Sequence, residues 1–296
     1  MRIVNIDGSL EFADSMTAEH TDIPESNGAA QTIFLLGGHD LEMLTIRKLL
    51  ETRQVPFADR NLSWGAKASD YQAEIEQWDH PGHHLVFIEL IIDLQPSQAS
   101  WSVVDHHGPQ AGRGTPTSLE QVARMLGVSD QEFAGHRDWQ LVAANDRGHV
   151  RGMRQLDPPA TDDEIRQIRL ADLQAQGITD QQLEHARRDA KQAEWLCDGR
   201  LTVVRTSGHD RSGLIADVLE PFFGGPGFDN LLVIGADEVG FFGRGELVQG
   251  LADQSPSPPD AWYGGNLPEY GYWGARRSQL TFTPLDWLQQ QFQDQD

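Results

Sequence analysis

Charged side chains and histidines follow several apolar runs in the first half of the sequence. The clearest case is the segment VVDHHG at 103–108, in which an acid and two histidines come directly after a pair of valines. In open α/β sheets ligands bind at the carboxyl ends of the strands, so residues at such positions carry weight beyond their composition. The residues placed in this way are His39, Asp40 and Glu42 after TIFLLGG, Glu89 or Asp93 around LVFIEL, Asp105, His106 and His107 after WSVV, and Asp146 in the segment LVAANDRG.

This set of carboxylates and imidazoles is typical of a site for one or two divalent ions of the manganese, magnesium or zinc type. Two such ions activate a water molecule and neutralise the charge of an in-line phosphoryl transfer. Simpler explanations exist for two positions: a hydrogen-bonding role for His39, and an N-cap of the following helix for Asp40. Glu89 is harder to explain in that way, because an unpaired carboxylate inside an apolar run is costly to bury.

The elements that would position these residues alternate between strands and helices. Short apolar runs predict the strands, and helical spacing marks the segments between them, one of which begins with a cap-like Thr117 followed by Glu120. The alternation predicts a mostly parallel sheet flanked by helices on both faces. The expected elements are strands at 32–38, 55–61, 84–91 and 100–108, and helices at 41–51, 69–78 with Ser69 as N-cap, 117–127 and 131–148.

The pattern changes after DPPATDD at 157–163. The following stretch, up to about residue 196, is rich in Gln and charge and has helical spacing in two pieces, split by GITD at 177–180. Strand patterns return from residue 200, so we expect a helical connector and then a second, smaller α/β domain. The predicted division is an N-terminal extension (1–30), a metal-binding α/β domain (31–157), a helical connector (158–198) and a C-terminal substrate-binding α/β domain (199–296).

Basic and glycine-rich segments supply the candidates for substrate binding. Arg147 follows Asp146 directly, and guanidinium groups bind phosphate through paired hydrogen bonds, although a salt bridge on the helix surface is their commoner use. The segment WYGGNLPEYGYWGARR predicts a glycine-rich loop whose aromatic rings could stack on a base. The arginines at its end, Arg276 and Arg277, are the expected contacts to the non-reacting part of a substrate.

Composition limits the partners and the compartment. The 296 residues suit two domains, and 45 Asp and Glu against 23 Lys and Arg give a net charge of −22, which excludes long duplex nucleic acid as an expected partner. The single Cys197 excludes an intrachain disulfide and a cysteine-based metal site, so a metal must be held by His and carboxylate. No apolar signal region follows basic residues at the start, and the most apolar run is short and acidic. We therefore expect a soluble, cytoplasmic protein that does not bind membranes.

The motif VVDHHG resembles the name-giving motif of the DHH phosphoesterase superfamily. The neighbouring segments follow the order of that superfamily's motifs: Asp40-Leu41-Glu42 resembles its Asp-x-Asp after a strand, Glu89 its lone strand-end acid, and Asp146 its later Asp in a helix. The resemblance covers about residues 32–153. Over about 200–280 it is fainter, and there the glycine-rich segment is similar to the substrate loop of the DHH-associated C-terminal domain, which implies Gly264, Gly265 and Asn266 as substrate contacts.

The resemblance implies a role for each motif residue and two bound ions, Mn2+ in the first place and Mg2+ as the other choice. His106 would face the scissile phosphate and, with Asp105, form the catalytic pair. The chain departs from the family pattern at Leu36, where the family has a histidine, and at Glu42 and Glu89, where it has aspartates. The implied metal ligands are Asp40, Glu42, Glu89, Asp105, His107 and Asp146, to which His39 is added as a replacement for the missing imidazole.

We therefore expect a two-domain α/β hydrolase that cleaves a phosphodiester or phosphoanhydride in a small nucleotide, cyclic dinucleotide or short oligonucleotide through a metal-activated water. An inorganic polyphosphate stays open as a substrate, and a homodimer stays open as the assembly. Two alternatives are kept. One is a non-catalytic nucleotide-binding or sensory protein with a degenerate metal site, and the other is an interaction protein whose acidic face binds partners.

Overall fold

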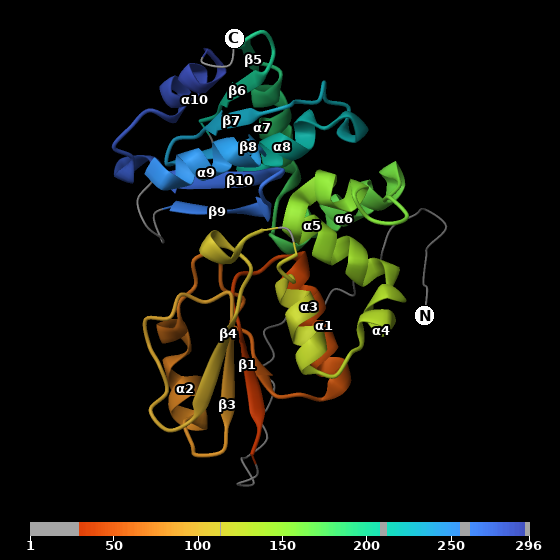
Figure 1. The fold of residues 1–296 in the computed structure, drawn as a ribbon, viewed down its shortest axis with the longest axis vertical. Coiled ribbons are helices and arrows are strands. Elements are labelled where there is room, and N and C mark those ends of the chain that lie inside the picture. Colours follow the sequence, from red (N-terminus) through yellow and green to blue (C-terminus); the bar gives the residue numbers. More distant parts are fainter. Residues whose placement is uncertain (1–29, 113, 208–211, 255–260, 294–296) are drawn as a thin grey trace.

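The computed structural model describes residues 30–112, 114–207, 212–254 and 261–293. The predicted N-terminal extension, residues 1–30, lies outside the described residues except for its last position. Strands and helices form two layered parts, each built on one sheet, and the second sheet lies above the first in Figure 1. Among the described helices, none combines the length and the apolar character that a membrane span requires.

The first sheet is parallel throughout, in the order β2-β1-β3-β4, which confirms the parallel α/β architecture expected for this part. Successive side chains of a strand point to opposite faces. On β1, Phe34 and Leu36 therefore pack with α1 and α3, while Ile33 and Leu35 pack with α2 on the other face (Figure 1). The elements of this part are β1 (Thr32–Leu36), α1 (Leu41–Arg53), β2 (Phe57–Ala58), η1 (Ala68–Tyr71), α2 (Gln72–Trp78), β3 (His84–Ile88), β4 (Ser100–Val104), η2 (Gly108–Gln110), α3 (Ser118–Met125), α4 (Asp130–Ala134) and α5 (Arg137–Arg154).

Helix ends agree with the sequence in one place and differ in two. Thr117 caps α3 and forms the predicted capping box with Glu120. Ser69 is not an N-cap, because it lies inside the 3-10 helix η1, where its backbone N–H and its hydroxyl both donate to the carboxylate of Asp93. The single helix expected over 131–148 is two helices, because α4 ends at Ala134 with Gly135 as its C-cap, and α5 starts at Arg137.

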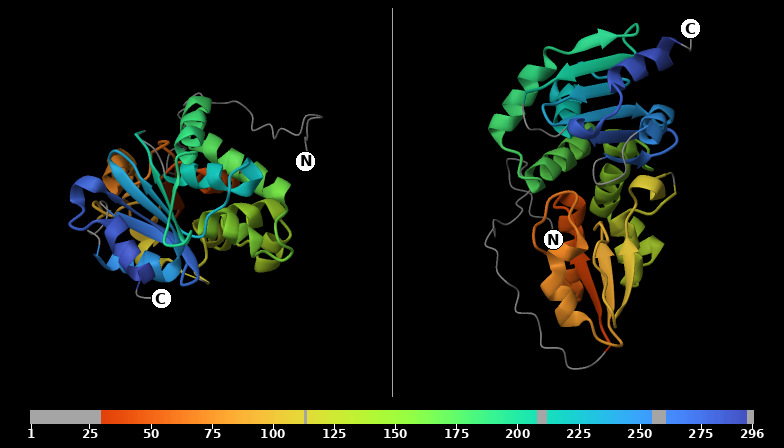
Figure 2. Two further views of the ribbon diagram at one scale, coloured as in Figure 1. Left: turned by 90° about the horizontal axis from the view of Figure 1, so that it is seen from above. Right: turned by 90° about the vertical axis from the view of Figure 1, so that its left-hand side faces the viewer.

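The second part begins with the expected pair of helices, α6 and α7, and continues into a mixed sheet of order β5-β6-β7-β8-β10-β9. Only β6 and β7 pair in parallel. Helices α7 and α8 pack on one face, and α9 and α10, which the sequence pattern did not reveal, pack on the other (Figure 2). The elements are α6 (Asp162–Ala175), α7 (Asp180–Ala190), β5 (Glu194–Leu196), β6 (Leu201–Arg205), α8 (Ser212–Leu219), η3 (Pro221–Phe223), β7 (Leu231–Ile234), β8 (Glu238–Arg244), α9 (Gly245–Gln254), β9 (Ala261–Asn266), β10 (Tyr270–Arg276), η4 (Arg277–Gln279) and α10 (Pro284–Gln293).

The segment predicted as a glycine-rich loop is an antiparallel hairpin of β9 and β10. Its glycines make room for aromatic rings of the partner strand. A Cβ at Gly264 would lie 2.6 Å from the hydroxyl oxygen of Tyr272, and one at Gly274 would lie 2.5 Å from the indole of Trp262. The glycines therefore serve close cross-strand packing, and the expectation of a loop is wrong.

The second sheet lies across the carboxyl edge of the first. Strand β9 packs against η2 and α5, which follow the strand ends of the first sheet (Figure 1). The Arg151 guanidinium lies 3.9 Å from the ring centre of Tyr270, and the Asn266 amide donates to Gln155 Oε1 at 2.6 Å. Side chains of β9 and β10 thus meet the edge at which the candidate site residues lie.

A buried ion network joins the two parts. Arg169 on α6 makes two hydrogen bonds of 2.8 Å to the carboxylate of Asp217 on α8, and it also donates to Asn145 and Asp172. The second oxygen of Asp172 accepts the backbone N–H of Leu41 at 3.1 Å. Burial alone would raise the pKa of Asp217, but the Arg169 guanidinium lowers it to about 2. A buried charge needs such partners, because water cannot solvate it.

We expect Asp217→Asn to lower the free energy of unfolding at pH 7 by about 3 kcal/mol, because it removes one side of a fully buried ion pair. The pKa of Asp217 is lower in the folded state, so its contribution is present above about pH 4 and is lost as the pH falls toward 2. The difference in free energy of unfolding between the unmodified protein and Asp217→Asn should therefore become smaller as the pH falls from about 4 toward 2. Urea unfolding at pH 7 and pH 3 measures both effects.

Glu184→Gln is the control, because the Arg187–Glu184 pair is exposed and such pairs contribute little. If Asp217→Asn were as stable at pH 7 as this control, the buried ion network would not contribute to the stability of the fold.

Candidate metal centre

Four side chains from three elements converge at the carboxyl edge of the first sheet. Glu89 follows β3, His106 and His107 follow β4, and Asp146 lies on α5. Each offers one ligand atom, and these four atoms all lie within 4.8 Å of one another. The parallel sheet explains the convergence, because the carboxyl ends of its strands meet at one edge. We call these four residues the acid–histidine cluster.

The fit of this cluster to a metal ion can be judged from its unpaired atoms. Four buried atoms here have no hydrogen-bond partner: Glu42 Oε2, His106 Nε2, His107 Nε2 and Asp146 Oδ2. His106 Nε2 lies 2.5 Å from Asp146 Oδ2 and 3.5 Å from Glu42 Oε2. Buried polar atoms normally have partners. A divalent cation would accept lone pairs from all of these nitrogen and oxygen atoms at once, so these residues fit a divalent metal ion.

The charges of the cluster lead to the same conclusion. Burial raises the pKa of Glu89 well above its usual range, and the neighbouring Asp146 carboxylate raises it further. Burial alone would lower the pKa of His106, but Asp146 and Glu42 raise it to about 12. Without a metal, a proton on the His106 imidazole would compensate part of this negative charge. Metal ligands must be deprotonated, so a bound divalent ion would take the place of that proton.

The two glutamates that replace aspartates also contact helix α3. Glu42 Oε1 accepts the backbone N–H of Leu119 at 3.1 Å, which leaves Oε2 facing His106. Glu89 Oε1 accepts the hydroxyl of Ser118 at 2.7 Å. These side chains reach both the N-terminal turn of α3 and the cluster, and the first N–H groups of a helix lack partners within the helix. The longer side chain thus serves two contacts.

The backbone beside Glu89 is unusual in a way that fits this placement. Glu89 has φ +51°, a left-handed conformation that is uncommon for residues other than glycine. Gly37, after β1, packs so closely against it that a Cβ there would lie 2.5 Å from the carbonyl oxygen of Ile88. Only glycine fits this approach of the two strand ends.

The other two expected ligands at the start of α1 differ in placement. Asp40 is the N-cap of α1, with Oδ1 accepting the N–H of Met43 at 2.9 Å. Burial and the Asp146 charge raise its pKa, so its carboxylate also lies within the field of the cluster. The structure does not bring His39 into the cluster: burial lowers its pKa, and its nearest charged neighbours are Asp59 and Arg47.

Asp105 and His106 make different contacts beside His107. Asp105 Oδ1 accepts the backbone N–H of His107 at 2.9 Å and lies 3.0 Å from His107 Nδ1. A carboxylate on one ring nitrogen orients an imidazole so that its other nitrogen faces a metal. His106, by contrast, is only 5% exposed and lies inside the ligand group. It was expected to face the scissile phosphate.

Two aromatic rings flank His107: that of Tyr272, which lies in the segment whose rings we expected to stack on a base, and that of Trp64, which we did not predict. The Trp64 indole meets the His107 ring edge-on with 5.0 Å between ring centres, and the Tyr272 ring lies 6.5 Å away. Burial raises the pKa of Tyr272 well above its usual range, and the charge of Asp146 adds to this effect. Tyr272 belongs to β10, so the second sheet supplies a side chain to the site. The glycines on either side of Tyr272, Gly271 and Gly274, could have indicated close packing of its ring. The sequence around Trp64 contains no comparable pattern.

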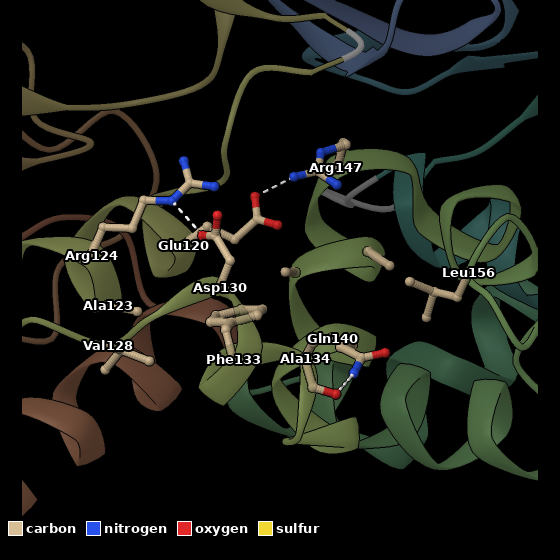
Figure 3. A pocket seen from close by; sticks show the side chains of 12 residues that line it. Glu120, Ala123, Arg124, Val128, Asp130, Phe133, Ala134, Gln140, Arg147 and Leu156 are labelled. Carbon is tan, nitrogen blue, oxygen red and sulfur yellow. Dashed lines mark hydrogen bonds and ion pairs between the residues drawn. The ribbon is translucent and has the colours of Figure 1, made fainter.

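The predicted substrate residues are dispersed. Arg147 contacts Glu120 through Nη2, and its buried Nε has no partner (Figure 3). It lines two adjoining cavities: one of about 240 Å³ between α3, α4 and α5, and one of about 450 Å³ that also includes Asn266 and Gly114. Neither cavity is lined by the acid–histidine cluster.

The remaining predicted contacts lie on the hairpin or beyond it. Gly264 accommodates the hydroxyl of Tyr272, and Gly265 has φ +114° with Gly271 packed against it. Arg276 ends β10 and is paired in register with Glu238. The Arg277 guanidinium donates to the carbonyl oxygens of Gly235 and Ala236. Arg277 thus stabilises the turn between β7 and β8.

Comparisons with known proteins give a remote likeness. No protein-family model and no curated protein matches the chain. A solved structure of exonuclease RecJ bound to manganese is 11% identical with a TM-score of 0.36, and the match covers 90% of this chain and 89% of that one. RecJ from Thermus thermophilus in complex with Mn2+ is 13% identical with a TM-score of 0.41, and the match covers 90% of this chain but 51% of that one. The chain thus spans about half the length of the second protein.

RecJ is a member of the DHH superfamily, which the motif VVDHHG resembles. At these TM-scores the likeness decides nothing about activity. The functional argument depends on the geometry of the cluster.

We expect Asp146→Asn to weaken Mn2+ binding by about a hundredfold, because even partners outside the ligand set change metal affinity 10- to 100-fold. Isothermal titration of the purified protein with MnCl2 measures the affinity and the number of ions. Asp138→Asn, an exposed position near the start of the same helix, should bind Mn2+ like the unmodified chain. Equal affinity in both variants would remove Asp146 from the ligand set.

Proposed function

We propose that the protein is a metal-dependent phosphoesterase that hydrolyses a phosphodiester or phosphoanhydride in a small phosphate compound. The observation that carries this proposal is the convergence of four metal-ligating side chains at the carboxyl edge of a parallel sheet, three of which have a buried atom without a hydrogen-bond partner. Carboxylate and imidazole ligands suit Mn2+ and Mg2+, the ions most used in phosphoryl transfer. Two ions, as the motif resemblance implies, are part of the proposal.

Each side chain of the centre has a distinct task in this proposal. A divalent ion would supply Lewis-acid activation of water and neutralise the charge that develops on the phosphoryl group. Glu89, His106, His107 and Asp146 hold the ion, and Glu42 adds an unpaired oxygen beside them. Asp105 accepts from Nδ1 of His107, which leaves Nε2 free for the centre.

The neighbourhood of the cluster supports an anionic substrate of limited size. Arg147 directly follows Asp146 on α5, and its buried Nε–H group has no hydrogen-bond acceptor. A guanidinium binds phosphate oxygens well, so Arg147 would hold a second phosphate of the substrate in the cavity of about 450 Å³ that it lines. The net charge of −22 repels long nucleic acids. A dinucleotide or a cyclic dinucleotide satisfies both conditions.

Hydrolysis of a 5′-phosphorylated dinucleotide and of bis(p-nitrophenyl) phosphate in the presence of MnCl2 tests the proposal. We expect turnover that EDTA abolishes. His107→Ala and Asp146→Asn should each reduce kcat/KM by about a thousandfold, because several kcal/mol of transition-state stabilisation are lost. Asp138→Asn should retain full activity.

A protein that binds Mn2+ in the titration but hydrolyses neither compound would contradict the proposal. That result would favour a non-catalytic nucleotide-binding protein.

A further inference from the structure

Trp64 is exposed beside a buried polar centre. Among the large apolar side chains of the described residues, it has the highest exposed fraction, 51%. Its ring nevertheless touches the site, since the ring centres of Trp64 and His107 are 5.0 Å apart at an interplanar angle of 77°. The remaining exposed tryptophans, Trp101 and Trp195, lie on edge strands.

The backbone that carries Trp64 is anchored to the end of β1. Gly38 forms an isolated bridge with Leu62, and the N–H of His39 donates to the carbonyl oxygen of Leu62 at 2.8 Å. A Cβ at Gly38 would lie 3.3 Å from the Cα and N atoms of Trp64. The indole is therefore held beside the cluster by contacts on its backbone and against His107.

We infer that Trp64 is a stacking surface for a nucleobase of the substrate, and that the substrate is accordingly a nucleotide rather than an inorganic polyphosphate. The inference rests on the proposed function, because it places the scissile phosphate at the acid–histidine cluster. An indole that remains half exposed beside this cluster offers a flat apolar surface to the group attached to that phosphate. Every base has a π-face, and stacking on an aromatic side chain contributes about 1–3 kcal/mol per base.

A polyphosphate would gain nothing from this residue. Its oxygens need donors and cations, which an indole face does not supply, apart from the single N–H of its ring. A nucleotide uses both features at once: the phosphate at the cluster and the base on Trp64. The two substrate classes therefore differ in their dependence on this one side chain.

The first test compares two substrates, a 5′-phosphorylated dinucleotide and inorganic triphosphate, with Mn2+ present. We expect Trp64→Ala to raise KM for the dinucleotide about tenfold relative to KM for triphosphate, with kcat for the dinucleotide little changed. Trp64→Phe should restore most of the dinucleotide affinity, because a phenyl ring also stacks. Trp195→Ala, an exposed tryptophan on β5, should leave both KM values unchanged.

The second test needs no catalysis. AMP should quench the tryptophan fluorescence of the unmodified protein, and the quenching should disappear in Trp64→Phe but persist in Trp195→Phe. Equal quenching in both variants would overturn the inference, and so would a Trp64→Ala protein that loses kcat equally for both substrates. The absence of any hydrolysis by the unmodified chain would overturn the proposed function, while the AMP titration would still decide the role of Trp64.

Discussion

A single buried guanidinium connects the parts of this protein that the candidate site needs. Arg169 binds Asp217 of the second part with two hydrogen bonds, and it binds Asn145, the neighbour of Asp146, with a third. Through Asp172 it also reaches the N–H of Leu41, the residue after Asp40. Breaking a buried ion pair is costly, so this network restricts how the second part can move relative to the helix and the strand end that carry the acids.

This restriction of movement matters because bringing the charged groups of the site together is energetically unfavourable. Several carboxylates and two imidazoles are removed from water at one sheet edge, and burial together with mutual repulsion raises the pKa of Glu42 and Glu89. The surrounding structure must hold these groups together until a cation compensates their charge. Helix α3 contributes through its N-terminal donors, and Asp105 contributes by orienting His107. Tyr272 closes the site from the second sheet.

Sequence patterns predicted the features that depend on residues close together in the chain. The order of the first four strands, the parallel sheet and the capping box at Thr117 follow from short-range periodicity and side-chain chemistry, although each of these strands ends two to four residues earlier than predicted. Features that depend on long-range packing were missed. The glycines of the second half look like a loop in sequence, but they seat Tyr272 and Trp262 across a hairpin. Trp64 reaches His107 only through tertiary contacts that no sequence spacing reveals.

Contacts in this structure explain how Glu42 and Glu89 fit at positions where the DHH motif pattern has aspartates. A glutamate in place of aspartate moves its carboxylate farther from the backbone, which by itself would disturb a metal site. Here Glu42 uses that length to accept an N–H of α3 while its other oxygen stays unpaired beside His106. Glu89 adopts a left-handed backbone directly after its strand and accepts from Ser118. The longer side chains are thus compensated by helix α3 and by the close approach of Gly37, and the ligand atoms still converge. The convergence of these side chains on one sheet edge is the condition that the proposed metal binding requires.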